Sequence, residues 1–256
     1  MIHPTVIIDP TSNIDENVEI GPYTVIGANV SIGSGTIIGP HVTINGITKI
    51  GKNNRIYQFS SIGEDPQDKK YAGEKSFLEI GDNNELREFT TIHRGTSQDN
   101  NITIIGSNNL LMAYTHVAHD CVIADDVILA NAASLGGHVH IGNNVILGGF
   151  SIVHQFCHLG EHCFAAMGSA ITKDVPPFVM VGGRPTKPHG INTVGLDRRG
   201  FSAETILHIK RAYKVLYKSG MKLSEASIKL AELAKEQPEL GVLVKFIEKS
   251  NRSILR

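Results

Sequence analysis

Histidine is concentrated in the middle of this 256-residue chain. Eight of the twelve histidines fall between residues 93 and 162, namely His93, His116, His119, His138, His140, His154, His158 and His162. An imidazole can remove a hydroxyl proton near neutral pH, and a carboxylate beside it can fix its tautomer; Asp120 directly follows His119. A backbone N–H of glycine can stabilise negative charge on a carbonyl oxygen. The groups needed for acyl transfer to an alcohol are therefore present without a serine or cysteine nucleophile.

The spacing of aliphatic residues indicates how these groups are positioned. Every sixth residue is isoleucine from Ile8 to Ile62, and every sixth residue is aliphatic from Ile105 to Ile171. This period matches neither a helix nor an alternating strand and is typical of the hexapeptide repeat of a parallel β-helix. Three hexads make one triangular coil, so residues eighteen apart stack. Gly137 is then predicted one coil above His119, and His138 above Asp120, with His116 within about 5–10 Å.

Two breaks in the register predict protruding loops. Between Ile62 and Ile80 the register positions hold Asp68 and Glu74, which cannot face an apolar core unpaired. We therefore expect a loop near residues 63–79. The step from Ile92 to Ile105 is one residue longer than two hexads, which predicts a second loop near residues 94–104. Long loops in a regular solenoid are often functional.

The repeat stops at Pro176-Pro177, and helical signals follow. Ser202 resembles an N-cap, Ser224 is expected to open a second helix, and a last helix is expected from about Glu239 to Ser250. The predicted organisation is a parallel β-helix over residues 1–190 and an all-α part over residues 191–256. Because the helical part is too thin to fold alone, we expect it to pack on the β-helix or on a neighbouring subunit.

Charge and cysteine usage narrow the class of protein. Residues 196–256 carry a net charge of +6 and the remainder −7, so the basic tail suits a phosphate-bearing ligand or an acidic partner, while the overall balance of −1 does not favour nucleic acid. The three cysteines, Cys121, Cys157 and Cys163, all fall at an inward hexad position and are expected to be reduced. No signal peptide and no membrane span is predicted, and we expect a cytoplasmic protein.

Two other classes of protein fit parts of the pattern. Three histidines on neighbouring coils could hold a catalytic zinc ion, as in trimeric β-helix carbonic anhydrases, but zinc would leave the first loop and the basic tail unexplained. A non-catalytic β-solenoid scaffold would need no base at residue 119.

Several motifs together resemble the UDP-N-acetylglucosamine acyltransferases that open lipid A synthesis in Gram-negative bacteria. They are Gln67-Asp68-Lys69-Lys70-Tyr71-Ala72-Gly73, Thr91-Ile92-His93-Arg94-Gly95-Thr96, His116-Val117-Ala118-His119-Asp120-Cys121, Val153-His154-Gln155-Phe156-Cys157 and Leu196-Asp197-Arg198-Arg199-Gly200-Phe201-Ser202. The likeness spans essentially the whole chain. It implies a left-handed parallel β-helix, a homotrimer, active sites between subunits, and neither cofactor nor metal.

The resemblance also implies roles for individual residues. His119 would be the general base on the sugar 3-hydroxyl, with Asp120 orienting it and the Gly137 N–H stabilising the thioester oxygen. The donor would be an (R)-3-hydroxyacyl group on acyl carrier protein. Residues implied to bind substrate are Asp68 and Lys70, reaching the neighbour's site, His116, His138, His154 and Gln155 in the sugar pocket, and Asn192, Arg198 and Arg199 at the nucleotide.

Two residues depart from the pattern of the family. Val194 stands where an acidic residue is expected near the nucleotide. Met167 stands where long-chain members carry glycine, so we predict a shortened acyl groove. The N-acyltransferase of the same pathway, which acts on UDP-3-O-acylglucosamine, is a further alternative; it normally carries an additional N-terminal domain, whereas here the repeat begins by Ile8. The sequence does not decide whether the acceptor offers oxygen or nitrogen at C3.

Overall fold

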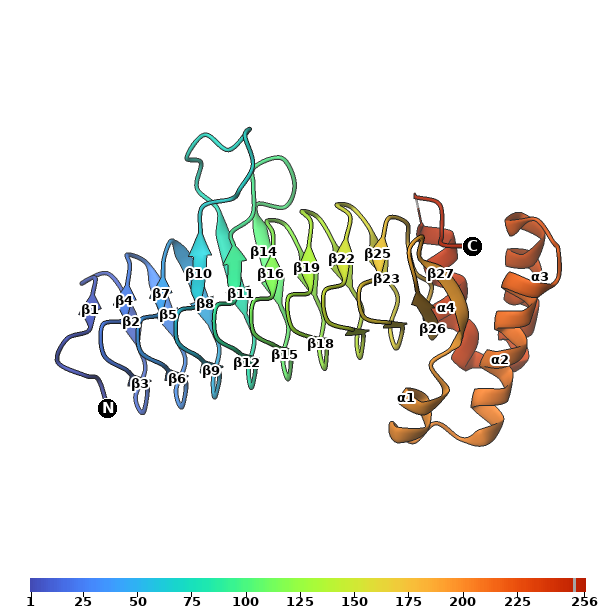
Figure 1. The fold of residues 1–256 in the computed structure, drawn as a ribbon, viewed down its shortest axis with the longest axis horizontal. Coiled ribbons are helices and arrows are strands. Elements are labelled where there is room, and N and C mark those ends of the chain that lie inside the picture. The colour runs from blue at the N-terminus through green and yellow to red at the C-terminus, as the bar shows by residue number, and fades with distance from the viewer. Residues whose placement is uncertain (251) are drawn as a thin grey trace.

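The computed structural model describes residues 1–250 and 252–256 and shows a long prism of coiled strands with helices at one end (Figure 1). Three sheets form its faces. In order along the prism, face 1 contains β1 (Ile7–Ile8), β4 (Val25–Ile26), β7 (Thr43–Ile44), β10 (Ser61–Glu64), β13 (Thr91–His93), β16 (His116–Val117), β19 (Ser134–Leu135), β22 (Ile152–Val153) and β25 (Ala170–Ile171).

The other two faces repeat this arrangement. Face 2 contains β2 (Asn13–Ile14), β5 (Val30–Ile32), β8 (Ile47–Ile50), β11 (Phe77–Ile80), β14 (Ile102–Ile105), β17 (Val122–Ile123), β20 (His140–Ile141) and β23 (His158–Leu159). Face 3 contains β3 (Glu19–Ile20), β6 (Ile37–Ile38), β9 (Arg55–Ile56), β12 (Glu85–Leu86), β15 (Leu110–Leu111), β18 (Ile128–Leu129), β21 (Ile146–Leu147), β24 (Phe164–Ala165), β26 (Val179–Gly182) and β27 (Lys187–Ile191).

The hexad register is the register of the coils. Val117 pairs in parallel with Leu135, and Leu135 with Val153, each eighteen residues on. These aliphatic side chains point into the prism, where Ile62, Val117 and Leu135 are fully buried. Each such side chain contributes roughly 1.5–3 kcal/mol on burial. The three cysteines predicted at the other inward position of the hexad are buried as well, so the predicted pattern of the core is confirmed.

Both loops leave the same corner of the prism. One spans residues 65–76, between β10 and β11, and the other spans residues 94–101, between β13 and β14. They project together from the corner between faces 1 and 2 (Figure 1). Residues 118–121 connect β16 to β17 at this corner on the next coil. The fold thereby places the His119 segment beside the two loops.

The sheet continues beyond the end of the hexad pattern. β26 adds to face 3 in parallel with β24, and β27 returns antiparallel to it. The proline pair at 176–177 ends the hexads but not the sheet, because Val179 and Val181 still bury their side chains in the core.

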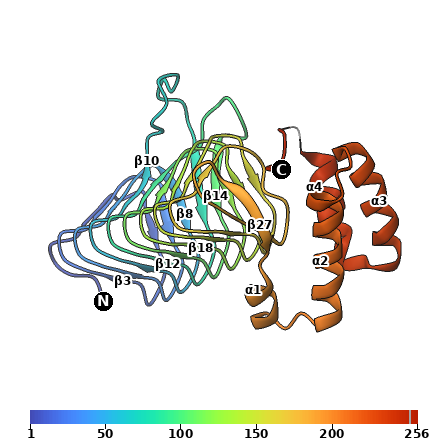
Figure 2. The ribbon, with the colours of Figure 1, turned by 45° about the vertical axis from the view of Figure 1, so that its right-hand side comes forward.

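The C-terminal helices form a bundle against the end of the prism (Figure 2). They are α1 (Thr193–Arg198), α2 (Ala203–Lys218), α3 (Leu223–Glu236) and α4 (Gly241–Lys249), with a 3-10 turn at Pro238–Leu240. Ser202 is the N-cap of α2, as predicted, and accepts from the Thr205 N–H at 3.0 Å. The helix α3 begins one residue before Ser224, because the Glu225 carboxylate accepts from the Lys222 N–H. Helix α1 was not predicted.

The bundle is joined to the β-helix by apolar contacts. Tyr213 and Leu255 belong to the core of the prism, while Leu216, Leu230 and Leu243 form a second core among the helices. The three cysteines are buried and unpaired. Among the described residues, no helix is long and apolar enough to cross a bilayer.

Candidate active site

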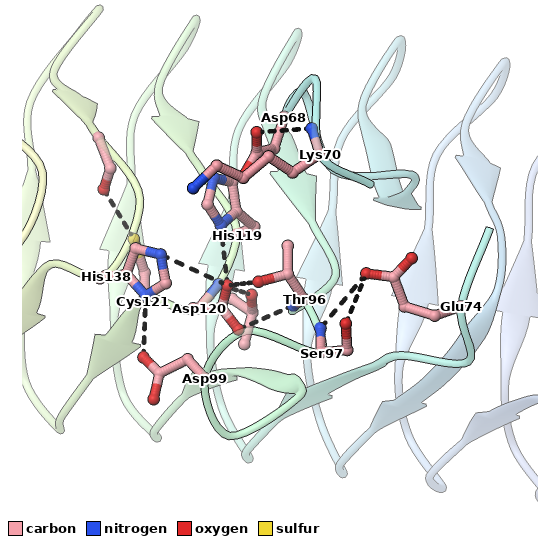
Figure 3. Close-up of polar contacts among 12 residues, drawn as sticks. Asp68, Lys70, Glu74, Thr96, Ser97, Asp99, His119, Asp120, Cys121 and His138 are labelled. Atoms are coloured by element: carbon pink, nitrogen blue, oxygen red, sulfur yellow. Dashed lines mark hydrogen bonds and ion pairs between the residues drawn. The ribbon is translucent and has the colours of Figure 1, made fainter. Parts of the chain in front are cut away.

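His119 and Asp120 form a hydrogen-bonded pair at the corner below the loops (Figure 3). The His119 Nδ1 lies 2.8 Å from Asp120 Oδ2, and the two side chains are 12% and 1% exposed. Because a carboxylate accepts, Nδ1 carries the hydrogen and Nε2 keeps its lone pair. This is the tautomer that a general base needs.

Three further hydrogen bonds fix Asp120. The Thr96 N–H donates to Oδ1 at 2.8 Å, the Thr96 hydroxyl donates to Oδ2 at 2.6 Å, and the Asp120 N–H donates to the Thr103 hydroxyl at 2.8 Å. Burial acts to raise the pKa of Asp120, but the hydrogen bonds from His119 and Thr96 outweigh it and hold this pKa below its usual value. The group beside His119 is therefore a carboxylate at neutral pH.

Gly137 lies against the His119 ring, as the eighteen-residue register predicts. A Cβ at Gly137 would lie 2.7 Å from His119 Nε2. Within the described residues the Gly137 N–H donates no backbone or side-chain hydrogen bond. The base nitrogen thus lies beside a glycine whose amide donor is free.

A cavity of about 410 Å³ opens beside the pair, lined by Gln67, His93, His116, His119, Gly137 and Gln155 among others. Burial, and then the neighbouring His93 and His119, lower the pKa of His116 to about 4, so its ring is neutral near pH 7. Its Nδ1 lies 2.8 Å from the Thr91 hydroxyl. The cavity therefore presents uncharged hydrogen-bonding groups beside the base.

The first loop borders this cavity and is fastened at its base. His93 Nδ1 contacts the Asp65 carbonyl at 2.5 Å, and the buried Arg94 guanidinium donates to Gly63 and Asp65. Asp68 and Lys70 lie farther along this loop, where the Lys70 N–H donates to the Asp68 carboxylate at 3.0 Å (Figure 3). Gln67, near the start of this loop, lines the cavity of the same chain. That Asp68 and Lys70 reach the active site of a neighbouring subunit stays a prediction.

His138 lies beside the pair but does not line the cavity. Its Nδ1 is 2.8 Å from Asp99 Oδ2, and its Nε2 is 3.9 Å from Asp120 Oδ2. The ring stacks on Phe156 with centroids 4.3 Å apart and meets the His119 ring edge-on at 5.1 Å. His154 is exposed and contacts Arg252 at 3.2 Å.

The predicted nucleotide residues lie elsewhere in the chain. Asn192 is the buried N-cap of α1, and its side chain accepts from the Gly195 N–H. Arg199 donates to Asn144 at 2.6 Å, at the corner between faces 2 and 3, while Arg198 and Val194 are exposed. In Figure 1, α1 and the loops lie on opposite edges of the molecule. A single chain thus does not bring Arg198 and Arg199 to His119.

Met167 is 81% exposed and shares one side of the prism with other exposed apolar residues, Phe150 and Ile152, which are 69% and 49% exposed. Because Ile152 also lines the cavity, the apolar surface continues from the cavity toward Met167.

Among the residues that the structure describes, one group of side chains could in principle ligate a metal. Ligand atoms of His119, Asp120 and His138 lie within 4.8 Å of one another. However, His119 Nδ1 and both Asp120 oxygens are already used in hydrogen bonds, which a zinc ion would have to displace. The donor set fits the histidine–carboxylate pair better than a zinc site.

Sequence reasoning missed Thr96, Thr103 and Asp99 as parts of the site. Thr96 ends the Thr91–Thr96 motif that carries the family resemblance, but the resemblance implies no role for it. Nothing in the hexad register predicts Asp99, because it lies on the loop that leaves the register.

Parts of the β-helix and the C-terminal part of the chain match models of known protein families. Residues 174–255 match the family described as Udp N-acetylglucosamine O-acyltransferase, domain 2, and residues 11–46 and 102–137 match bacterial transferase hexapeptide repeats. Fold and site together define a hexapeptide-repeat acyltransferase with a left-handed parallel β-helix and a helical C-terminal part.

Relatives cover the full chain. The acyl-[acyl-carrier-protein]–UDP-N-acetylglucosamine O-acyltransferase of Thiobacillus denitrificans is 52% identical over 255 residues, covering 100% of this chain and 99% of that protein. The structure of the Francisella novicida UDP-N-acetylglucosamine acyltransferase has a TM-score of 0.99 at 46% identity, covering 100% and 94%. The structure of the Moraxella catarrhalis UDP-N-acetylglucosamine O-acyltransferase has a TM-score of 0.98 at 48% identity, and the match covers 100% of this chain and 99% of that chain. The chain belongs to this family of UDP-N-acetylglucosamine O-acyltransferases, which confirms the resemblance.

Proposed function

We propose that this protein transfers an (R)-3-hydroxyacyl group from acyl carrier protein to the 3-hydroxyl of UDP-N-acetylglucosamine, the first step of lipid A biosynthesis. The observation that carries the proposal is that His119 Nε2 lies beside Gly137, whose main-chain N–H is free among the described residues, in a chain of this family. The activity in the relatives' names supplies the substrates, and the geometry supplies the roles.

The reaction needs one base and one oxyanion donor. His119 Nε2 removes the proton of the sugar 3-hydroxyl. The hydroxyl oxygen attacks the thioester carbonyl carbon at the same time and forms a C–O bond. The Gly137 N–H donates to the oxygen that becomes negative. As the C–S bond breaks, the imidazolium of His119 returns the proton to the leaving thiolate. Asp120 holds His119 in place and stabilises its charged form.

The cavity beside His119 takes the acceptor sugar. His116 and Gln155 line it and offer uncharged hydrogen-bonding groups. Asp68 and Lys70, on the loop bordering this space, reach the sugar, its phosphates or the end of the pantetheine. His154 lies near Gln155 at the same corner. The apolar surface toward Met167 receives the acyl chain. The methionine side chain shortens the groove that is open to this chain.

The functional unit is a homotrimer with sites between subunits. The outward positions of face 1 are Ile7, Val25, Thr43, Ser61, Thr91, His116, Ser134, Ile152 and Ala170, none of them Asp, Glu, Lys or Arg; the strands of this face hold one such residue, the half-buried Glu64 at the end of β10. Faces 2 and 3 each carry such charges, for example Lys49 and Glu85. A ladder of stacked, exposed rings runs along the corner between faces 3 and 1: Tyr23, His41, Phe59, Phe89 and Tyr114. A face with so few charges, beside an aromatic ladder, favours burial against another subunit.

That assembly would also complete the nucleotide site. Arg198 and Arg199 lie far from His119 in their own chain, so a neighbour must supply them. Arginine is well suited to the diphosphate. Asn192 and Val194 would lie near the same end of the ligand.

The basic helical part receives the acyl carrier protein, which is acidic. Lys210, Lys214 and Lys218 are exposed at four-residue spacing on α2, so they form one basic stripe. Such a stripe steers an acidic partner toward the site. We propose the cytoplasm as the location, in keeping with three unpaired, buried thiols.

Product analysis tests the proposal directly. The purified protein is incubated with UDP-N-acetylglucosamine and a panel of (R)-3-hydroxyacyl carrier thioesters, and the products are identified by tandem mass spectrometry. We expect one ester at O3. An amide formed only with UDP-3-O-acylglucosamine would instead identify the N-acyltransferase of the pathway.

A further inference from the structure

The turn at residues 96–99 makes two contacts with the site at once. The Asp99 N–H donates to the Thr96 carbonyl at 3.3 Å, which closes the turn. Its first residue, Thr96, holds the Asp120 carboxylate, and its last, Asp99, contacts His138 Nδ1 at 2.8 Å (Figure 3). The two ends of one turn of the second loop are therefore hydrogen-bonded to the two residues beside His119, namely Asp120 and His138.

His138 is held on every side. Asp99 accepts from Nδ1 on the loop side, Phe156 stacks on one ring face at 4.3 Å, and Asp120 lies 3.9 Å from Nε2. The main-chain N–H of His138 donates to the His119 carbonyl at 3.0 Å, and the two rings meet edge-on. The side chain is 12% exposed and does not line the cavity, so the ring supports the base from behind.

We propose that Asp99 is a positioning residue for the reaction, acting through the ring of His138 on the His119–Asp120 pair. This inference rests on the proposed function. The Asp99 carboxylate fixes the hydrogen of His138 on Nδ1 and sets the ring angle, and the fixed ring keeps His119 against Gly137. Displacing a base by about 1 Å can cost a hundredfold in rate, so an indirect contact can govern turnover.

The position of His138 decides which kinetic constant changes. Because the ring touches the base and not the cavity, loss of Asp99 should lower kcat and leave the KM for UDP-N-acetylglucosamine within about twofold. Asp99→Ala removes the hydrogen-bond acceptor and should lower kcat by about tenfold. Asp99→Asn keeps a neutral acceptor, so its kcat should lie between those of the parent and Asp99→Ala.

A double-mutant cycle separates the ring from the loop. In a His138→Gln background, Asp99→Ala should cost nothing further, because its effect passes through the ring. The control is Ser97→Ala, on the same loop as Asp99, which removes the 3.0 Å hydrogen bond from the Ser97 hydroxyl to Glu74 of the first loop and should leave kcat unchanged. Melting temperatures of all variants verify that each is folded.

The spectrum of the free protein tests the contact without any substrate. In protein carrying 15N-labelled histidine, the His138 signal should report hydrogen on Nδ1 in the parent, and this signature should weaken in Asp99→Ala. If the proposed function is wrong, the parent protein forms no product, but its spectrum still shows the contact between Asp99 and His138. The proposal is overturned if Asp99→Ala keeps the parent's kcat, if only KM changes, or if its loss persists in the His138→Gln background.

Discussion

The ring of His119 occupies the space that any side chain at Gly137 would need. A Cβ on Gly137 would lie 2.6 Å from Cε1 and 2.7 Å from Nε2 of that ring. The two residues are eighteen apart in sequence, so the coil repeat itself brings the base beside this glycine.

Gly137→Ala should therefore disable the enzyme by displacing the base. We expect kcat to fall by at least about a hundredfold, the scale of losing an oxyanion donor or misplacing a base. Steady-state kinetics with the carrier thioester measure this. Gly241→Ala, where a Cβ would meet nothing within 4 Å, is the control and should keep full activity. A Gly137→Ala enzyme as fast as the control would contradict the geometry.

Met167→Gly should lengthen the acyl chain that the enzyme prefers. We expect the parent to favour chains of roughly ten to twelve carbons, because a side chain in a packed groove excludes an equal ligand volume. Competition among carrier thioesters of increasing length, read by product mass, gives the ratio of kcat/KM values. If the parent prefers the longest chain offered, the methionine moves aside and sets no limit.

The stability of the fold should fall in mild acid, and His162 is one of the groups responsible. This side chain is 9% exposed, and burial, together with Arg199, lowers its pKa from 6.5 to about 4. Between these values the unfolded chain binds a proton that the folded chain does not, so stability is lost as the pH falls from 6.5 toward 4. Thermal melting from pH 5 to 8 should show a lower melting temperature at the acid end.

His162→Phe should reduce that dependence and leave the part that comes from His116, whose pKa burial also lowers to about 4. Phenylalanine suits this left-handed corner, since Phe156 and Phe178 adopt the same positive φ, and it can keep the stack on Phe178. His3→Phe, at an exposed position before β1, is the control and should leave the slope unchanged. Equal slopes for the parent and His162→Phe would assign the acid sensitivity to other groups.

Removing metal should leave turnover intact. His119, Asp120 and His138 could approach a zinc ion only by giving up hydrogen bonds that hold the base. We expect activity to survive dialysis against a chelator, and added zinc to inhibit by competing for these atoms. Elemental analysis giving one zinc per chain, with activity lost on its removal, would favour the hydratase alternative.

The sequence predicts those parts of the site that obey the coil register. The eighteen-residue spacing placed Gly137 by His119, and the polar residues Asp68 and Glu74 at inward positions revealed the first loop. In contrast, the contacts of Thr96 and Asp99 depend on how a loop folds back, which no periodicity encodes. Arg198 and Arg199 were assigned to the nucleotide by likeness, but their distance from His119 follows from the hairpin and α1, which continue past the repeat.

The most direct test of the account is the turnover of His119→Gln beside the parent, with UDP-N-acetylglucosamine and an (R)-3-hydroxyacyl carrier thioester. Mass spectrometry should find the O3 ester from the parent. The variant, folded by its melting temperature, should form this ester at least about a hundredfold more slowly, because it lacks the base. Product formed by the variant at the parent's rate would contradict the assignment of His119 as the general base.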